Sequence, residues 1–288
     1  MMSAWIDPWR AATVALGRVH RHGVKQKSGK RTVRTMFMIV GTGVIFGFPD
    51  DPTETPWLVT ARHVFHDPSE GWAPARLNVR FSWFDEKDVD EYFGVSLELR
   101  RKGRRCWMPH PDPDVDLACM PLTLTKVQTG KAKLPRIAVG AFAPVKEIYE
   151  GAPVAVLGHP GAVGPRFWSR AILRQGVVSW VSPTHPGSNV FLVDSNVFPG
   201  NSGGPVFKLP AGTDRQGNFA VGGNVAFLGV VSQARIQMMP LIAGGKELEV
   251  QLKGRKKPET LFVPSFVALG VIEPAFRVKQ LLVTAARG

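Results

Sequence analysis

The amino-acid sequence predicts an all-β fold of two barrels with about six strands each, followed by a C-terminal helix. Short apolar runs rich in β-branched and aromatic residues recur along the chain, with turn residues between them. Glycine (30 residues) and proline (24 residues) are scattered throughout, which leaves little room for long helices. A chain of 288 residues is long enough to bury a substantial core and to form two barrels.

The apolar runs fall into two sets. Residues 1–125 form a first half, residues 126–152 a connection bearing proline and glycine, and residues 153–288 a second half. In the first half we expect strands at residues 12–19, 35–48, 55–61, 76–84, 94–100 and 115–122. In the second half we expect strands at residues 152–160, 169–181, 189–195, 204–209 and 224–234. Residues 273–288 show helical apolar spacing and end in basic residues, which predicts a C-terminal helix.

The formal net charge of +13 is the unusual feature of the composition, and it is concentrated in residues 18–34, 100–105 and 253–257. We interpret these runs as solvated loops. The alternative is a surface for nucleic acid, anionic lipid or an acidic protein. No aromatic residues alternate with the basic ones in the way that base stacking requires. The acidic run at residues 84–92 is expected to be an exposed loop, because its spacing does not match a calcium-binding EF-hand.

Cysteine content and hydropathy bear on the cellular compartment. Cys106 and Cys119 are the two cysteines, too few for a disulfide framework, so we expect free thiols in a reducing environment. The N-terminus lacks a basic start followed by an uninterrupted apolar core, and no segment approaches the roughly 18 apolar residues of a membrane span. We therefore expect a cytoplasmic protein with no membrane partner, no metal and no cofactor.

Three segments carry residues suited to nucleophilic catalysis. "FPGNSGGPVF" (198–207) places Ser202 in a glycine-rich turn, and "WLVTARHVF" (57–65) places His63 just after an apolar strand. A serine hydroxyl needs a neighbouring base, and that base needs a group to orient it. The carboxylate has three candidates, Asp112, Asp114 and Asp116. Asp116 is favoured because the apolar "LACM" follows it directly.

The motifs "VTARHV", "DLACM" and "PGNSGGPV", in this order, resemble those of the chymotrypsin-like serine peptidases. The "PGNSGGP" form is similar to the high-temperature-requirement (Deg) branch of that family. The resemblance implies two six-stranded Greek-key β-barrels with the active site in the cleft between them. It also implies that His63, Asp116 and Ser202 form a catalytic triad, and that the amides of Gly200 and Ser202 form an oxyanion hole.

Further segments carry the resemblance into the substrate site. "GVVSQA" (229–234) resembles the strand edge on which substrates add their backbone, so Ser232, Gln233 and Ala234 would bind the residues upstream of the scissile bond. Asn196 lies six residues before Ser202, where relatives that cleave after lysine or arginine carry aspartate. We therefore expect a preference for an uncharged or small residue, since a buried cation would lack a partner.

Other segments bear on how such an enzyme is built and controlled. Gly41 and Gly43 resemble the strand before the histidine, and "LFVPSF" (261–266) resembles the strand that closes the specificity pocket. Little chain remains for a peptide-binding PDZ domain. Residues 234–260 form a long insertion, which we interpret either as a regulatory or partner-docking loop or as a surface excursion.

The sequence thus predicts a serine endopeptidase that cleaves protein or peptide substrates through an acyl-enzyme. One alternative is a catalytically weak binding module on the same fold, recruiting an acidic protein or nucleic acid through the basic loops. The other is an esterase using the same triad. A regulatory protein is a further expected partner.

Overall fold

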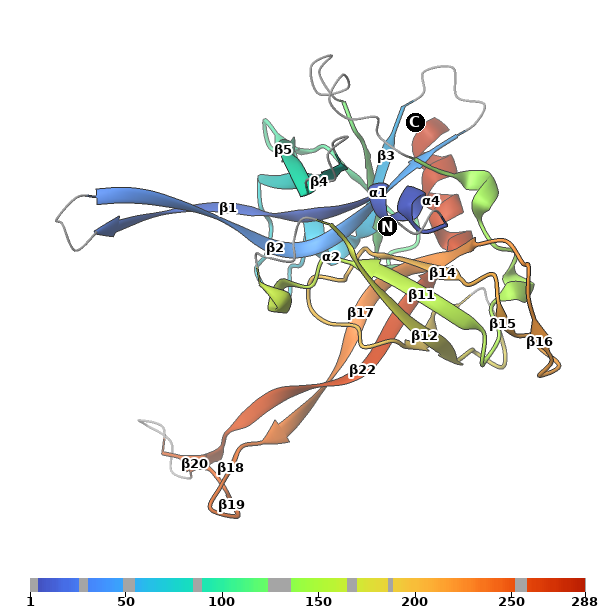
Figure 1. The fold of residues 1–288 in the computed structure, drawn as a ribbon. Coiled ribbons are helices and arrows are strands. Elements are labelled where there is room, and N and C mark those ends of the chain that lie inside the picture. Colours follow the sequence, from blue (N-terminus) through green and yellow to red (C-terminus); the bar gives the residue numbers. More distant parts are fainter. Residues whose placement is uncertain are drawn as a thin grey trace.

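The computed structural model describes residues 5–25, 31–48, 55–84, 90–123, 136–164, 170–185, 189–251 and 258–287. Strands of the first half form one curled sheet in the order β5-β4-β1-β2-β3-β9-β8, with β10 pairing to β2 (Figure 1). Their bounds are β1 (Thr13–Lys25), β2 (Arg31–Gly47), β3 (Trp57–Ala61), β4 (Arg76–Phe84), β5 (Asp90–Glu98), β8 (Met108–Pro109), β9 (Leu117–Pro121) and β10 (Ile137–Ala138). Two short helices accompany them, α1 (Asp7–Ala11) and α2 (Arg62–Phe65).

The second half is a closed barrel of six strands in the order β11-β12-β13-β22-β17-β14. Their bounds are β11 (Pro153–Gly158), β12 (Ile172–Trp180), β13 (Phe191–Asp194), β14 (Pro205–Lys208), β17 (Ala226–Pro240) and β22 (Phe262–Pro274). The connection contributes the 3-10 turns η1 (Val139–Ala141) and η2 (Val145–Glu147), and η3 (Gly161–Val163) follows β11. Helix α4 (Ala275–Arg287) ends the described chain.

Short two-stranded hairpins decorate both halves. They are β6 (Arg100–Arg101) with β7 (Arg104–Arg105), β15 (Gly212–Thr213) with β16 (Phe219–Ala220), β18 (Ile242–Ala243) with β19 (Lys246–Glu247), and β20 (Glu249–Val250) with β21 (Glu259–Thr260).

The predicted fold class is confirmed: the chain forms a two-barrel, mostly β structure with a C-terminal helix. Every strand expected from the apolar runs has a counterpart near the expected position. The two halves differ in closure. The second closes on itself through β14 and β11, whereas among the described residues no ladder joins the sheet ends β5 and β8 of the first half.

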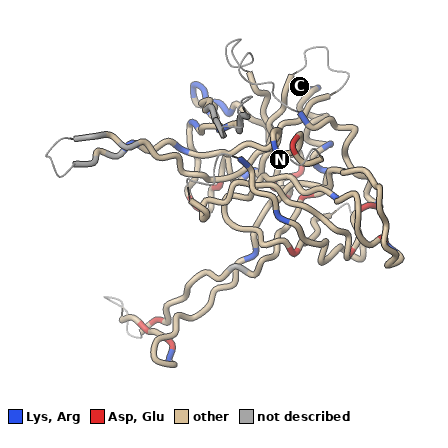
Figure 2. Tube along the Cα trace, in the orientation of Figure 1, with Lys and Arg blue, Asp and Glu red and all other residues tan. Residues whose placement is uncertain are grey.

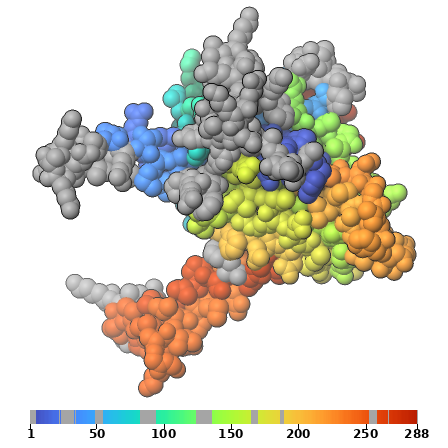
Figure 3. All heavy atoms as spheres, viewed as in Figure 1, coloured from blue at the N-terminus to red at the C-terminus, as the bar shows by residue number. Residues whose placement is uncertain are grey.

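Two long hairpins project from the body as arms (Figures 1 and 3). The first is made by β1 and β2, which pair from Thr13↔Val44 to Lys25↔Arg31. The basic run 18–34 was expected to be a solvated loop; this is wrong for its described part, which is strand on both sides of residues 26–30. Antiparallel strands can face water, and basic side chains can then remain solvated while the backbones pair. A high density of basic residues therefore did not exclude strand.

The second arm is made by β17 and β22, which remain paired from Gly229↔Pro274 to Pro240↔Phe262. The 234–260 insertion is therefore not a free loop at its start, because β17 continues through the barrel wall to Pro240. Both strands of this second arm carry exposed apolar side chains, among them Ile236, Met238, Met239, Phe262 and Val263. Hairpins β18–β19 and β20–β21 follow at its tip, where Figure 2 shows acidic residues.

The acidic run 84–92 was expected to be an exposed loop, but its described ends are strand, in β4 and β5. The β6–β7 hairpin, which carries "RRKGRR", is exposed along both strands. Figure 2 shows lysine and arginine spread over both halves of the chain. Residues 253–257 lie outside the described residues, as do residues 85–89 of the acidic run, whose flanks are the ends of β4 and β5. No helix in the described part of the chain is long and apolar enough to cross a membrane.

One hydrophobic cluster joins the two halves. It contains Trp9 of α1 and Phe46 of β2, together with Phe207 and Phe227 of the second barrel. Trp9 stacks on Phe207 with ring centroids 5.1 Å apart, and Phe46 meets Phe227 edge-on at 5.1 Å. Helix α4 adds its buried face, including Leu282, to the same cluster. The cluster therefore packs the two halves against each other.

Candidate active site

His63 lies in the single turn of α2, directly after the fully buried strand β3. Burial of β3 and of the next two residues in α2, Val64 and Phe65, anchors this turn. The His63 side chain stays 33% exposed, so one side of the imidazole faces the surface. On its other side, Nδ1 lies 2.7 Å from Oδ2 of Asp116. A carboxylate at this distance fixes the Nδ1–H tautomer and leaves Nε2 as the acceptor.

Asp116 immediately precedes β9, and its side chain is only 14% exposed. Its Oδ1 accepts a hydrogen bond from the His63 backbone amide at 3.0 Å, in addition to the imidazole contact of Oδ2. Of the three candidate carboxylates, the structure thus brings Asp116 to the histidine. Asp112 is exposed and its Oδ1 accepts instead from the amide of Asp114, which is exposed as well.

A hydroxyl group from the other barrel also contacts Asp116. Ser232 is 3% exposed, and its Oγ donates to Oδ2 of Asp116 at 2.9 Å. Sequence reasoning had assigned Ser232 only a role in backbone pairing with substrate. No local pattern marks this side-chain contact, because it joins residues 116 positions apart in the chain.

Ser202 sits half-buried in a turn that requires two of its glycines. Gly200 has φ +96 and Gly203 has φ +89, a region that residues with a Cβ rarely adopt. A Cβ on Gly203 would also lie 1.9 Å from the carbonyl oxygen of Thr42. The expectation that glycine shapes this turn is therefore supported by both backbone angle and space.

Strand β2 ties this turn to the first half of the chain. Thr42 donates its amide to the Ser202 carbonyl at 2.7 Å and its Oγ1 to the Gly200 carbonyl at 2.7 Å. Neighbouring Gly41 is close-packed: a Cβ there would meet Val64 at 2.6 Å and the Ser202 carbonyl at 3.2 Å. The backbone of Ser202 thus packs beside the residue that follows His63.

The hydroxyl of Ser202 makes no hydrogen bond to the His63 ring among the described contacts, although the two segments are neighbours. Catalytic hydrogen bonds are often long in a free enzyme and shorten with substrate. The amides of Gly200 and Ser202 likewise donate to no other described residue, whereas the Asn201 amide between them donates to Phe198 at 3.0 Å.

The predicted substrate strand has one open edge. β14 pairs with β17 only as far as Pro205↔Val230, while β22 continues along the opposite edge through Gln233↔Val271 and Ala234↔Gly270. Gln233 is exposed and Ala234 half-buried. Asn196 is also exposed, and its φ of +47 is a left-handed conformation that asparagine tolerates.

His63 lines two hollows in the surface. The larger, about 1000 Å³, is lined by His63, Asp116, Gln233 and Ile236 among others. The smaller, about 280 Å³, is lined by His63, Val64 and Trp72 among others. Both hollows also share Asp67 and Glu70 in their linings.

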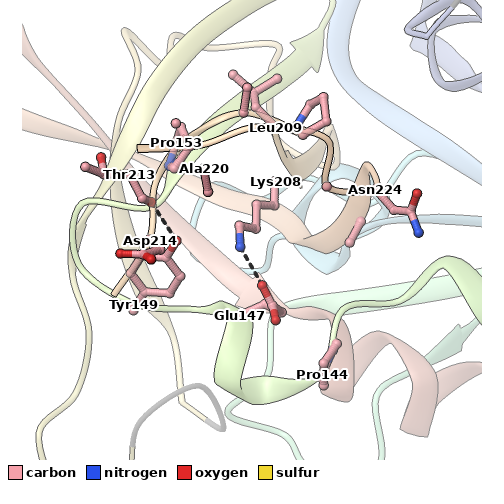
Figure 4. Close-up of a pocket in the computed structure, with 15 residues that line it drawn as sticks. Pro144, Glu147, Tyr149, Pro153, Lys208, Leu209, Thr213, Asp214, Ala220 and Asn224 are labelled. Atoms are coloured by element: carbon pink, nitrogen blue, oxygen red, sulfur yellow. Dashed lines mark hydrogen bonds and ion pairs between the residues drawn. The ribbon is translucent and has the colours of Figure 1, made fainter. Parts of the chain in front are cut away.

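A third hollow, of about 340 Å³, contains none of these residues. In Figure 4 Lys208 of β14 extends toward Glu147, with its Nζ 2.5 Å from the carboxylate, and Tyr149 lies nearby. Lys208 and Glu147 are paired with each other here, and the second carboxylate of the lining, Asp214, accepts hydrogen bonds from Gln216 and Asn218.

A buried histidine underlies the Ser202 turn. His159 follows β11, its amide donates to Thr42 Oγ1 at 2.9 Å, and a Cβ on Gly200 would lie 2.5 Å from its carbonyl oxygen. Burial lowers the pKa of the His159 ring to about 4, with the nearby Thr13 backbone opposing this only in part. The imidazole is therefore neutral near pH 7 and packs as an uncharged support for the turn.

Comparison with known proteins identifies the family. The model of the trypsin-like peptidase domain matches residues 41–213, which is more than half of the chain and includes His63, Asp116 and Ser202. The chain belongs to the trypsin-like peptidase family. Among solved structures, this trypsin-like domain is similar to the inactive form of a serine-to-alanine mutant of Rv3671c from M. tuberculosis H37Rv, with 18% identity and a TM-score of 0.43 over 97% of this chain and 88% of that one. A comparison with curated proteins finds no match.

Proposed function

We propose that this trypsin-like peptidase is a serine endopeptidase in which His63, Asp116 and Ser202 act as the catalytic triad. The observation that carries the proposal is the 2.7 Å contact between His63 and Asp116, made beside the glycine turn that presents Ser202. A histidine oriented through Nδ1 has Nε2 free to accept a proton, which is the arrangement that activates a hydroxyl.

In the proposed reaction, His63 Nε2 takes the Ser202 hydroxyl proton while Oγ attacks the scissile carbonyl carbon. The carbonyl π electrons pass to the oxygen, and the amides of Gly200 and Ser202 donate hydrogen bonds to that oxyanion. When the tetrahedral intermediate collapses, the C–N bond breaks and His63 gives its proton to the leaving amine. Water then attacks the resulting ester by the same steps and releases the acid. Asp116 remains ionised and stabilises the imidazolium.

The open edge of β17 favours peptide substrates. A substrate backbone added beside Ser232–Ala234 would run along the larger hollow and place its scissile bond near His63. Asn196 brings no negative charge to the specificity pocket, so we propose cleavage after an uncharged or small residue.

The test is a cleavage profile of the purified protein on a peptide library, beside Ser202→Ala as its control. We expect internal cleavage by the wild type, covalent labelling of Ser202 by an organofluorophosphonate, and loss of both in the variant. Equal turnover or equal labelling of Ser202→Ala would refute the assignment. A wild type that neither cleaves nor labels, but binds peptides or nucleic acid, would instead support a binding module.

A further inference from the structure

Glu273 is a buried carboxylate near the C-terminal end of strand β22, only 2% exposed. An ionised carboxylate at such a position is costly unless both oxygens have partners. Here both do. Oε1 accepts a hydrogen bond from the backbone amide of Asp116 at 3.1 Å, and Oε2 accepts one from Nη1 of Arg277, in the first turn of α4, at 2.8 Å.

Arg277 is itself held in place. Its Nη2 donates to Oδ1 of Asn189 at 3.3 Å, and its side chain is 19% exposed. The guanidinium therefore spans from the start of α4 to the segment before β13, and it neutralises Glu273 without access to bulk water on most sides. Its two terminal nitrogens thus serve different acceptors, one on Glu273 and one on Asn189.

The contact with Asp116 crosses from one half of the protein to the other. Asp116 belongs to the first half, where its carbonyl accepts the Arg62 amide at 3.1 Å and its carboxylate holds His63. From the second half, Ser232 binds its side chain and Glu273 binds its backbone. Glu273 therefore fixes the orientation of the Asp116 backbone amide, although it touches neither His63 nor Ser202 in any described contact.

We propose that Glu273, whose charge Arg277 neutralises, is a positioning residue for the His63–Asp116 pair. It holds the Asp116 amide, and through it the angle at which the carboxylate meets the imidazole. This inference rests on the proposed function, since positioning has a catalytic consequence only if the pair acts in catalysis. Small displacements matter in such a site, because a shift of about 1 Å can reduce the rate about 10²-fold.

Two double variants isolate the hydrogen bond from the charge. Glu273→Gln with Arg277→Met keeps an oxygen for the Asp116 amide and leaves no unpaired charge. Glu273→Leu with Arg277→Met also leaves no charge, but offers no acceptor. Both lose the ion pair, so the difference between them reports the contact with Asp116 alone.

We expect the glutamine variant to keep kcat within about threefold of wild type, and the leucine variant to lose kcat about 10- to 100-fold with little change in KM. The His63 Nδ1 proton should give a low-field ¹H NMR signal in the first and a shifted or broadened one in the second. Equal kcat values for two folded variants would overturn the proposal.

The single variant Arg277→Met keeps the proposal testable if the leucine variant does not fold. Glu273 still reaches Asp116 in it, so we expect a lower melting temperature and a kcat within about threefold of wild type. A loss of kcat of about tenfold or more in Arg277→Met would contradict the proposal. None of these outcomes bears on whether Ser202→Ala is inactive, so failure of this inference is distinct from failure of the proposed function.

Discussion

Replacing Gly200 by alanine would place a methyl group where the structure has no room for one. The new Cβ would lie 2.5 Å from the His159 carbonyl oxygen and 2.9 Å from the Gly161 amide nitrogen, both backbone atoms that cannot rotate away. The φ of +96 adds conformational strain of about 1–2 kcal/mol. Overpacking adds about 1–3 kcal/mol. We therefore expect the free energy of unfolding to fall by about 2–5 kcal/mol.

Gly151 provides a matched control for this experiment. Its φ is +84, yet an added Cβ would meet nothing within 4 Å, and it lies in the exposed turn before β11. Gly151→Ala should therefore lose only the conformational part, about 1–2 kcal/mol, and keep full activity. If the Gly200 amide binds the oxyanion as proposed, its displacement in Gly200→Ala should reduce kcat about 10²–10³-fold, the cost of losing one such donor.

The measurement combines urea unfolding with steady-state cleavage of a peptide identified in the library profile. Cleavage is compared without urea, at a temperature at which circular dichroism shows both variants to be folded. If folded Gly200→Ala cleaves within about threefold of Gly151→Ala, the proposed role of this turn in binding the oxyanion is refuted.

Three further predictions concern side chains around the site. Ser232→Ala removes the 2.9 Å hydrogen bond to Asp116. Because hydrogen bonds to charged groups contribute about 1.5–3 kcal/mol, we expect kcat to fall at least about tenfold. The control is Ser179→Ala on an exposed position of β12, and an unchanged kcat in Ser232→Ala would contradict this expectation. Because burial lowers the pKa of His159 from 6.5 to about 4, the unfolded chain binds the extra proton first as the pH falls. His159 should therefore lower the free energy of unfolding, measured with urea, by about 3 kcal/mol as the pH falls from 6.5 to 4. His159→Asn should lack this contribution. The same dependence of unfolding free energy on pH in the variant and the wild type would contradict the prediction. Burial raises the pKa of the Cys119 thiol to about 12, whereas Cys106 is only half-buried, so a thiol reagent should modify one cysteine in the native protein and two after unfolding.

Sequence patterns predicted most of the barrel strands because each strand carries its own alternation of apolar residues. They also singled out Asp116 among three nearby aspartates, since the apolar residues after it place it at the start of a buried strand. The same patterns did not predict how far β17 would extend beyond the barrel. Its outer part is exposed on both faces, so it lacks the buried–exposed alternation of a barrel strand.

The contacts that hold Asp116 were beyond sequence reasoning for a different reason. Ser232 lies 116 positions and Glu273 157 positions from Asp116, so neither spacing leaves a local signal. Glu273 could have drawn attention as the single acid in the apolar end of β22. Its contact with the Asp116 amide, however, exists only because the two halves pack against each other.

The shared hydrophobic cluster has a consequence for how the molecule can be divided. Helix α4, at the far end of the sequence, contributes Leu281 and Leu282 to a cluster that also holds Leu117 of the first sheet, and its contacts reach β9 as well as β17. Cutting the chain at the connection would thus expose apolar surface on both fragments. Melting is then expected to be a single event, and an affinity tag fused directly after α4 would disturb the histidine-bearing half as much as the serine-bearing one.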